Sequence, residues 1–263
     1  MYILMTVEFQ QQQSQSDRDW FEQAFNRDYL YIYSHRDDSE AEKHVKMAID
    51  HVPFSPGHQL LDIACGTGRH LQAFAQQGAN VTGIDLSDTM LAQAKKRFVK
   101  MGLPVRLEKH DMRKLPFSEE FDAVTMWFTS FGYFKDAEQD CIVLRTIAKV
   151  LKPNGWWWID LPNPIFLTDS LVPETKRNIK GPHGLARVVE KRRLIGDRVE
   201  KIIEISDEAG KREYTESVRL YKPDKFKRML QKSGLSPEGT LGDYDGIDFG
   251  ENTPRQIWYG RKA

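Results

Sequence analysis

Residues 60–70 read LLDIACGTGRH, and this stretch decides the fold. Its apolar beginning predicts a buried strand over residues 59–64, and residues 69–77 place apolar side chains at helical spacing. Gly66 and Gly68 form the turn between these two elements. Glycines at the start of a helix let a bound group approach backbone N–H groups at the positive end of the helix dipole. The turn therefore predicts either a tight connection alone or a ligand-binding site.

Strand and helix patterns continue to alternate around this turn. Four further strands are expected over residues 80–84, 104–109, 121–128 and 156–161. Helices are expected after the N-cap residues Ser39, Ser87 and Asp136. This alternation predicts an α/β fold, a Rossmann-like doubly wound parallel sheet with helices on both faces. Ligands of such sheets bind at the carboxyl edge of the strands.

The pattern changes after residue 163. Runs with period-2 alternation predict an inserted antiparallel meander with strands over residues 186–195, 198–206 and 212–221. The wound pattern then resumes, with a helix over 223–233 and strands around 236–243 and 255–261. We therefore expect an N-terminal segment, a discontinuous core and an inserted β unit, at residues 1–38, 39–163 with 223–263, and 164–222.

Composition restricts the partners of the protein. The chain has 38 Lys and Arg and 38 Asp and Glu residues, so no broad basic field favours nucleic acid. Its only cysteines, Cys65 and Cys141, exclude a disulfide scaffold and disfavour a cysteine-ligated metal. No apolar stretch approaches the ~20 residues of a membrane span, and no basic leader is present. We expect a cytoplasmic protein without a membrane partner or bound metal, and an irregular segment at the polar residues 9–17.

Acidic residues end the next two strands after the glycine turn. Asp85 closes the second strand, at the spacing of an acidic residue that binds ribose hydroxyls. Asp111 ends the third strand, where a carboxylate can accept from an adenine amino group. A dinucleotide fingerprint needs a third glycine at position 71, which is Leu71. The strand ends therefore indicate a nucleoside-like ligand, with a nicotinamide oxidoreductase as the weaker alternative.

Five segments, in order along the chain, resemble the motifs of one family. They read LLDIACGTGRH, VTGIDLS, HDMRKLPF, FDAVTMWFTSFGYF and LKPNGWWWIDLPNP. They look like the successive motifs of class I S-adenosylmethionine-dependent methyltransferases, over about residues 28–164 and again in the C-terminal segment. The resemblance implies S-adenosylmethionine as the cofactor. It also implies a seven-stranded sheet of order 3-2-1-4-5-7-6 with strand 7 antiparallel.

The resemblance implies a role for each matching residue. The methionine end of the cofactor would lie against the first motif, at Asp62, Ala64, Gly66 and Gly68. Ala64 stands where the family often has glycine. Asp85 would bind the ribose, and the adenine would lie among Leu86, Met90, Asp111 and the backbone of Met112. The sulfonium would face the end of the fourth strand, at Trp127 or Phe128.

The N-terminal segment YLYIYSHR resembles a helix that folds over the cofactor in a subset of these enzymes. In that arrangement Tyr33 and Arg36 would close the site. The guanidinium of Arg36 would meet the methionine carboxylate of the cofactor. A surface helix with an exposed arginine is the alternative.

The acceptor is predicted mainly by exclusion. The FTSF after the fourth strand lacks the D/N-P-P-Y/F element of DNA amino-methyltransferases, and neither cysteine lies in a Pro-Cys loop. The insertion resembles the β lids of small-molecule N-methyltransferases, so we expect a small-molecule acceptor, with an amine favoured. An S-adenosylmethionine-binding regulator or scaffold without transfer is the alternative, and either a monomer or a homodimer is compatible with the sequence.

Positioning is the main task of a methyltransferase, because the methyl group is already activated. A general base is therefore optional, and the sequence assigns none. Candidates in loops near the expected mouth are Tyr133, His183, Tyr244 and Asp245. The run Trp156–Trp158 predicts either an aromatic cage or, more simply, a strand packed between helices, with Trp157 on the opposite face from its two neighbours.

Overall fold

The computed structural model describes residues 19–263, and the irregular segment predicted at residues 9–17 lies outside them. The helices are α2 (Trp20–Ala24), α3 (Arg27–Ile32), α4 (Asp38–Ile49), α5 (Arg69–Gln76), α6 (Asp88–Met101), α7 (Ala137–Val150), α8 (Pro164–Ser170) and α9 (Pro223–Lys232). The strands are β1 (Gln59–Ile63), β2 (Asn80–Asp85), β3 (Arg106–Lys109), β4 (Phe121–Met126), β5 (Leu151–Pro162), β6 (Glu174–Gly181), β7 (Gly184–Ile195), β8 (Arg198–Asp207), β9 (Gly210–Arg219), β10 (Leu235–Leu241) and β11 (Arg255–Lys262). No helix among these residues is long and apolar enough to span a membrane.

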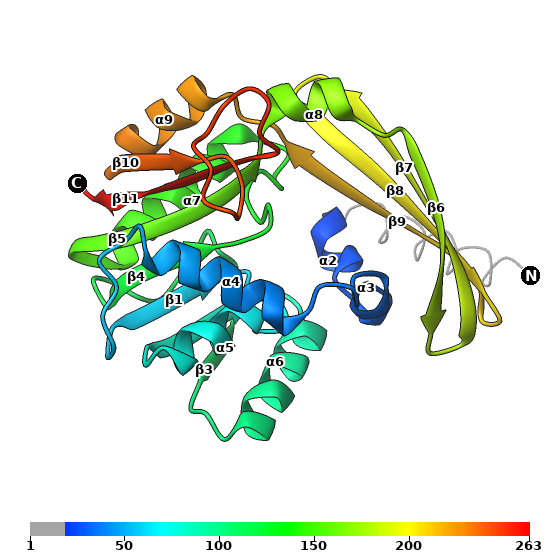
Figure 1. Cartoon of the computed structure of the whole chain (residues 1–263), viewed down its shortest axis with the longest axis horizontal. Coiled ribbons are helices and arrows are strands. Elements are labelled where there is room, and N and C mark those ends of the chain that lie inside the picture. Colours follow the sequence, from blue (N-terminus) through cyan, green and yellow to red (C-terminus); the bar gives the residue numbers. More distant parts are fainter. Residues whose placement is uncertain (1–18) are drawn as a thin grey trace, which may run out of the picture.

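The main sheet confirms the predicted topology. Its seven strands follow the order β10-β11-β5-β4-β1-β2-β3 (Figure 1). Strands β1 to β5 pair in parallel, whereas β11 pairs antiparallel with β5 and with β10. With β10 and β11 counted as the sixth and seventh strands, this is the expected order 3-2-1-4-5-7-6. The carboxyl ends of β1, β2 and β4 therefore meet at one edge of the sheet.

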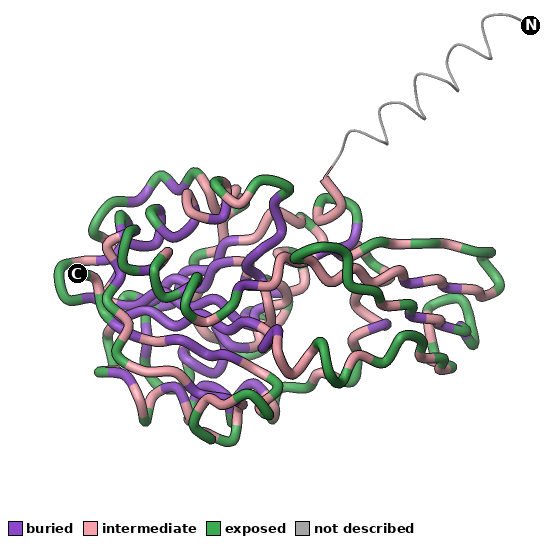
Figure 2. The backbone as a smooth tube through the Cα atoms, turned by 90° about the horizontal axis from the view of Figure 1, so that it is seen from above, coloured by how far each residue is buried: buried purple, intermediate pink, exposed green. Residues whose placement is uncertain are grey.

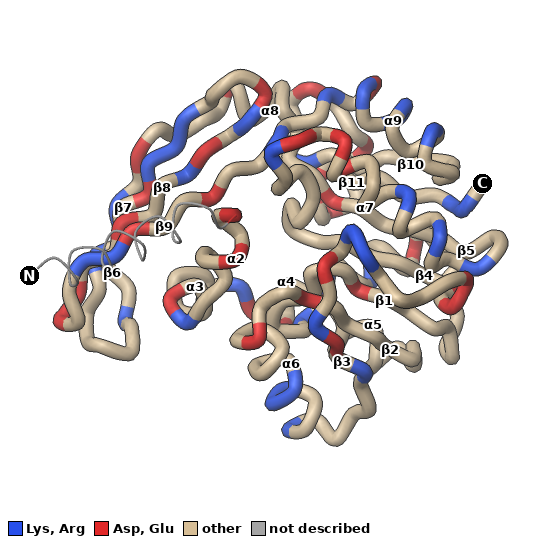
Figure 3. The backbone as a smooth tube through the Cα atoms, turned by 180° about the vertical axis from the view of Figure 1, so that it is seen from behind, with Lys and Arg blue, Asp and Glu red and all other residues tan. Residues whose placement is uncertain are grey.

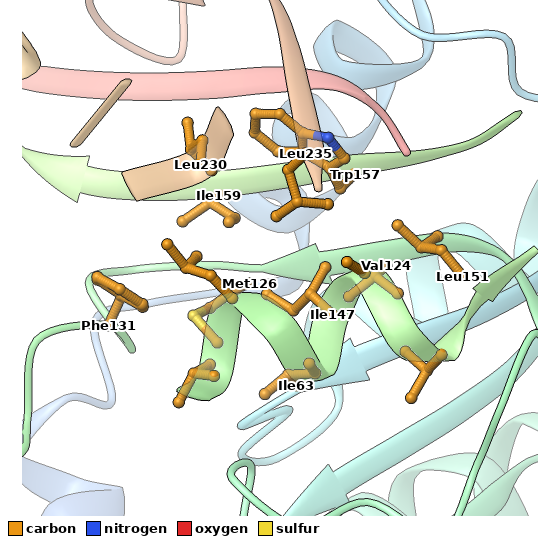
Figure 4. Packing of buried hydrophobic residues seen from close by; sticks show 14 of the residues in the cluster. Ile63, Val124, Met126, Phe131, Ile147, Leu151, Trp157, Ile159, Leu230 and Leu235 are labelled. Atoms are coloured by element: carbon orange, nitrogen blue, oxygen red, sulfur yellow. The ribbon is translucent and has the colours of Figure 1, made fainter. Parts of the chain in front are cut away.

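Alternating side chains divide the core into two layers. On one face, Trp157 and Ile159 of β5 pack with residues of α7 and α9, such as Ile147 and Leu230 (Figure 4). On the other face, Trp156 and Trp158 pack with residues of α4 and α5. All three tryptophans are buried, which confirms the strand interpretation over the aromatic cage. Figure 2 shows this buried core as the purple part of the chain.

The inserted unit is a separate antiparallel sheet of four strands, β6 to β9, and not three. Its strand β6 was missed because an arginine interrupts its weakly apolar inward-facing row. Arg177 lies between Thr175 and Ile179 in that row and pairs with Glu190 of β7 at 2.9 Å. A partly buried ion pair thus stands where sequence patterns need an apolar residue for a strand assignment. Charges of both signs also lie along β7 and β8 (Figure 3).

Helices α2 and α3 lie between the two sheets (Figure 1). Ile32 of α3 packs against the apolar residues of the inserted sheet, namely Ala186, Val188, Ile203 and Ile205. Polar contacts reinforce this layer, since Asp28 accepts hydrogen bonds from Arg212 and Tyr214 at 2.6 Å each. The inserted sheet therefore carries α3, which in turn faces the carboxyl edge of the main sheet.

One predicted helix cap was wrong. Ser39 lies inside α4, and the N-cap is Asp37, whose side chain accepts from the N–H of Glu40. Ser39 instead donates its hydroxyl to the Asp37 carboxylate at 2.9 Å. Ser87 and Asp136 cap α6 and α7 as predicted.

Asn163 closes the end of β5, and its loss should destabilise the fold. It is fully buried, caps α8 through the N–H of Ile165, and donates to the carbonyls of Gly250 and Thr253 at 2.9 and 2.8 Å. Asn163→Ala should lower the free energy of unfolding by about 2–4 kcal/mol, because a cap and two buried hydrogen bonds disappear. Denaturant unfolding measures the change. Asn178→Ala, at an exposed position of β6, is the matched control and should change it by less than about 0.5 kcal/mol.

Candidate active site

A cavity of about 620 Å³ lies at the carboxyl edge of the main sheet. Its volume falls within the range of ligand sites. Its wall combines the glycine turn, the ends of β1, β2 and β4, the loop after β3, and helices α2, α3 and α6. The wall contains every site residue predicted from the sequence except Gly68: Tyr33, Arg36, Asp62, Ala64, Gly66, Asp85, Leu86, Met90, Asp111, Met112, Trp127 and Phe128.

The two glycines of the turn have different roles. A Cβ on Gly66 would meet no atom within 4 Å, so the backbone there is open to the cavity. A Cβ on Gly68 would instead lie 3.2 Å from the Cβ of Ala94 in α6. Gly68 therefore permits close helix packing at a left-handed φ of 76°, and it does not line the cavity. Ala64 adopts a φ of 56°, a strained value for alanine that glycine would adopt more readily.

Asp85 is fixed by backbone donors. Its carboxylate accepts from the N–H of Gly66 at 2.9 Å and from the N–H of Ser87 at 2.8 Å. Burial raises the pKa of Asp85, while these hydrogen bonds oppose the shift. The side chain therefore lies at the cavity wall in one orientation, with further lone pairs for a ligand that donates hydroxyl groups.

Asp62 lies at the end of β1 and is almost completely buried. Burial raises the pKa of Asp62 to about 8, and the nearby Asp85 contributes to the rise. The hydroxyl of Thr125 donates to its carboxyl at 2.8 Å. At pH 7 the carboxyl is therefore mostly protonated and does not place a fixed negative charge in the wall.

Asp111 has a partner that the sequence did not indicate. The guanidinium of Arg113 donates to both carboxyl oxygens, from Nε at 3.0 Å to each and from Nη2 at 2.5 Å. Although burial raises the pKa of Asp111, these bonds hold it below its ordinary value. Arg113 also lies over the ring of Phe134 at 4.4 Å. The carboxylate is therefore ionised and immobilised beside the cavity.

Arg36 places a cation at the cavity wall. Its guanidinium lies between the rings of Tyr33 and Phe128, at 4.5 and 4.7 Å from their centroids. Its Nη1 donates to the hydroxyl of Tyr29 at 3.3 Å. Within residues 19–263 it forms no ion pair with a carboxylate. An anionic group of a ligand can therefore supply the missing counter-charge.

His70 lines the cavity although sequence reasoning did not select it. Its ring stacks parallel on Trp127 at a centroid distance of 4.4 Å, and its Nε2 lies 3.3 Å from Nδ1 of His44. Burial holds the pKa of His70 well below its ordinary value, so the imidazole is neutral. Its place directly after the glycine turn was the only signal in the sequence.

The four candidate bases differ in their position relative to the cavity. Tyr133 lines the cavity. Tyr244 does not line it and donates its hydroxyl to Asp160. His183 lies in the exposed turn between β6 and β7, and Asp245 is exposed in the loop after β10. Tyr133 is therefore the only one of these four residues that lines the cavity.

Comparisons with known proteins match this geometry. The sequence model of the methyltransferase-domain family matches residues 60–155. The dTDP-3-amino-3,6-dideoxy-alpha-D-glucopyranose N,N-dimethyltransferase of Streptomyces fradiae is 30% identical over 195 residues, which cover 71% of this chain and 73% of that protein. This chain belongs to the class I S-adenosylmethionine-dependent methyltransferases.

Further similarities extend over most of the methyltransferase. The dTDP-4-amino-2,3,4,6-tetradeoxy-D-glucose N,N-dimethyltransferase of Saccharopolyspora spinosa is 28% identical over 216 residues, 79% of this chain and 82% of that protein. The structure of an S-adenosylmethionine-dependent methyltransferase from Clostridium acetobutylicum ATCC 824 aligns with a TM-score of 0.73 at 20% identity, covering 88% of this chain and 94% of that one. The predicted fold, cofactor and enzymatic methyl transfer are confirmed, and no finding favours a binding protein without transferase activity.

The two turn glycines should respond differently to substitution. Gly66→Ala adds a methyl group in open space at the cavity wall and should weaken S-adenosylmethionine binding by about tenfold or more, and its left-handed φ of 55° should also cost about 1–2 kcal/mol of stability. Gly68→Ala presses on α6 and should mainly lower the free energy of unfolding, by about 1–3 kcal/mol. Calorimetric titration and denaturant unfolding of both variants measure the two effects. Equal losses of affinity in the two variants would contradict the separate roles.

Proposed function

We propose that this methyltransferase methylates the amine nitrogen of a small molecule, with an amino sugar as the favoured acceptor class. The observation that carries the proposal is the extent of the cavity. Beyond the residues expected to bind the cofactor, it continues along an aromatic wall of α2, α3 and the loop after β4, formed by Phe21, Phe25, Tyr29 and Tyr133. The two amino-sugar N,N-dimethyltransferases that align over more than two thirds of the chain support the same acceptor class.

The cofactor residues follow from the geometry of the wall. The open backbone at Gly66 and the unpaired cation of Arg36 suit the methionine part, with its carboxylate against the guanidinium. Asp85 would accept from the ribose hydroxyls. Asp111 and the backbone of Met112 would bind the adenine edge. S-adenosylmethionine supplies an activated methyl group when it is bound, so the protein has to orient the acceptor and exclude water.

The acceptor side of the cavity provides hydroxyl groups rather than a strong base. Burial raises the pKa of Tyr133 well above its ordinary range, so its phenol stays neutral and can donate or accept a hydrogen bond. Tyr29 likewise has a raised pKa because it is buried. An amine that enters in its neutral form already carries the lone pair that attacks, and the phenols would orient it.

The inserted sheet would act as a lid through α3. Tyr33 of that segment donates its hydroxyl to Glu216 of β9 at 2.9 Å, and Arg177 of β6 donates to the carbonyl of Ile32 at 3.1 Å. Removal of the sheet would therefore free α3 and disturb Arg36 as well. Cofactor affinity and acceptor turnover should then fall together. A lid that contacted only the acceptor would leave cofactor affinity intact.

A screen of acceptors with methyl-labelled S-adenosylmethionine tests the proposal. We expect label transfer to aminodeoxy sugars and their nucleotide-linked forms, and none to the matched hydroxy sugars or thiols. Asp85→Ala is the control, since loss of charge-assisted hydrogen bonds should weaken cofactor binding by about 10- to 100-fold. Transfer to a hydroxyl or thiol compound, with amines inert, would show that the acceptor class is wrong.

Cofactor binding should release a proton from Asp62. The folded-state pKa of about 8 leaves this carboxyl mostly protonated at pH 7 in the free protein. A cofactor ammonium group placed beside it would favour the ionised form and lower the pKa, so up to about one proton leaves on binding. Titration calorimetry at pH 7 in phosphate and in Tris should give different apparent enthalpies. Asp62→Asn should remove the difference, and identical enthalpies for the unaltered protein would place the ammonium elsewhere.

A further inference from the structure

The segment between β4 and α7 connects the cavity to the inserted sheet. Tyr133 and Phe134 both line the cavity. The ring of Tyr133 packs against Trp20 at 4.7 Å, and that of Phe134 against Phe21 at 5.4 Å. The backbone carbonyls of this segment accept hydrogen bonds from the inserted sheet. Its side chains thus shape the cavity while its backbone is held from outside.

Arg198, the first residue of β8, makes most of these contacts. Its Nη1 donates to the carbonyl of Phe134 at 2.9 Å, and its Nη2 to the carbonyls of Gly132 and Tyr133 at 3.1 Å each. The same guanidinium is anchored to Ser217 of β9, through the carbonyl at 2.7 Å and the hydroxyl at 2.9 Å. Across residues 19–263 it forms no ion pair, so neutral oxygens are its hydrogen-bond partners.

Arg219, at the end of β9, binds the same segment at its two ends, residues 132 and 135. Its N–H donates to the carbonyl of Gly132 at 2.8 Å, and its Nη2 to the carbonyl of Lys135 at 2.6 Å. The approach is close, because a Cβ on Gly132 would lie only 2.7 Å from the carbonyl oxygen of Arg219. With Arg198, four consecutive carbonyls of residues 132–135 are bound by two arginines of the insertion.

Only arginine can make the contacts of Arg198. Its planar guanidinium carries five N–H donors in a fixed arrangement, whereas lysine has three donors on one flexible nitrogen. Three carbonyls of successive residues and one strand carbonyl are therefore held at fixed relative positions. Loss of these donors would free the backbone that carries Tyr133, and small displacements of positioning groups are costly in group transfer.

We propose that Arg198 is a positioning residue for methyl transfer: the inserted sheet uses it to hold residues 132–134 so that Tyr133 forms the acceptor wall. The insertion then determines the shape of the cavity and does not merely cover it. The hydrogen bonds from Arg198 to the loop are observed directly in the structure. Its consequence for the acceptor rests on the proposed function.

Hydrogen–deuterium exchange tests the hold without any acceptor. In Arg198→Ala, peptides that cover residues 129–136 and the Arg219 amide should exchange about tenfold faster or more, while the turn at residues 63–69 stays unchanged. Millimolar guanidinium ion should restore part of the protection. Arg193→Ala is the matched control, because Arg193 pairs with Glu200 on the same sheet at 3.0 Å but does not contact the loop. Unchanged exchange over 129–136 in Arg198→Ala would overturn the proposal.

Two milder variants cover the case in which Arg198→Ala does not fold. Arg198→Lys should loosen the same peptides by a smaller factor. Gly132→Ala should loosen them with Arg198 intact, since the added methyl group pushes Arg219 away. A uniform rise in exchange throughout the chain in both variants would indicate a general stabilising role and overturn the positioning role.

Turnover tests the consequence for the reaction, with an amine found in the labelled-cofactor screen. Arg198→Ala should lower kcat by about 10- to 100-fold, and guanidinium ion should restore part of it. The KM for S-adenosylmethionine should change much less. A loosened loop with unchanged kcat would overturn the role in transfer. If exchange in the loop rises in Arg198→Ala but the protein methylates no amine, the role of Arg198 in holding the loop stands. Only the proposed acceptor class is then rejected.

Discussion

The hydrogen bond from the Gly66 N–H to the Asp85 carboxylate is the contact on which the site depends. It joins the ends of β1 and β2, beside a second link from the Cys65 N–H to the carbonyl of Ile84. The turn between them uses left-handed conformations at Ala64, Gly66 and Gly68. Glycine adopts such a conformation readily, whereas at Ala64 neighbouring contacts have to enforce it. One carboxylate therefore both holds the turn and faces the cavity.

The second half of the site is built by a different kind of interaction. The glycine turn rests on a buried apolar core, whereas α3 and the loop after β4 are held to the inserted sheet largely by arginines. Arg212 binds Asp28, Arg177 binds the end of α3, and Arg198 binds the loop. Such contacts are directional, so they fix relative positions more sharply than apolar packing does. They also explain how a thin, highly charged sheet can position the aromatic side of the cavity.

The two halves of the cavity differ in how they relate to the family. The main sheet and the cofactor motifs are those of the class I methyltransferases, and the chain shares them with enzymes of varied acceptors. In the proposed function, the acceptor wall comes from α2, α3 and the loop held by the insertion. Differences among these segments are therefore the natural place for acceptor choice to reside, because they can vary without altering the cofactor turn.

The sequence by itself determined the order of strands and helices, the glycine turn and the acidic strand ends. These are local features, since hydrophobic period and turn chemistry act within a few neighbouring residues. The correct caps at Ser87 and Asp136 belong to the same class, and the error at Ser39 was only two residues long. The missed strand β6 shows the limit of such patterns, because the partner of Arg177 in its inward row is Glu190 of the next strand.

Only the tertiary structure decided that Gly66 faces open space and that Gly68 packs against α6, since Ala94, the neighbour of Gly68, lies on a separate helix. It also decided that Asp62 is neutral, because burial among distant strands sets its pKa. The partners of Arg36 and Arg198 have the same origin. Arg198 meets carbonyls more than sixty residues away in sequence, and backbone oxygens are identical at every position. No side-chain pattern can mark such partners, so the shape of the acceptor wall is fixed by the fold and not by any local motif.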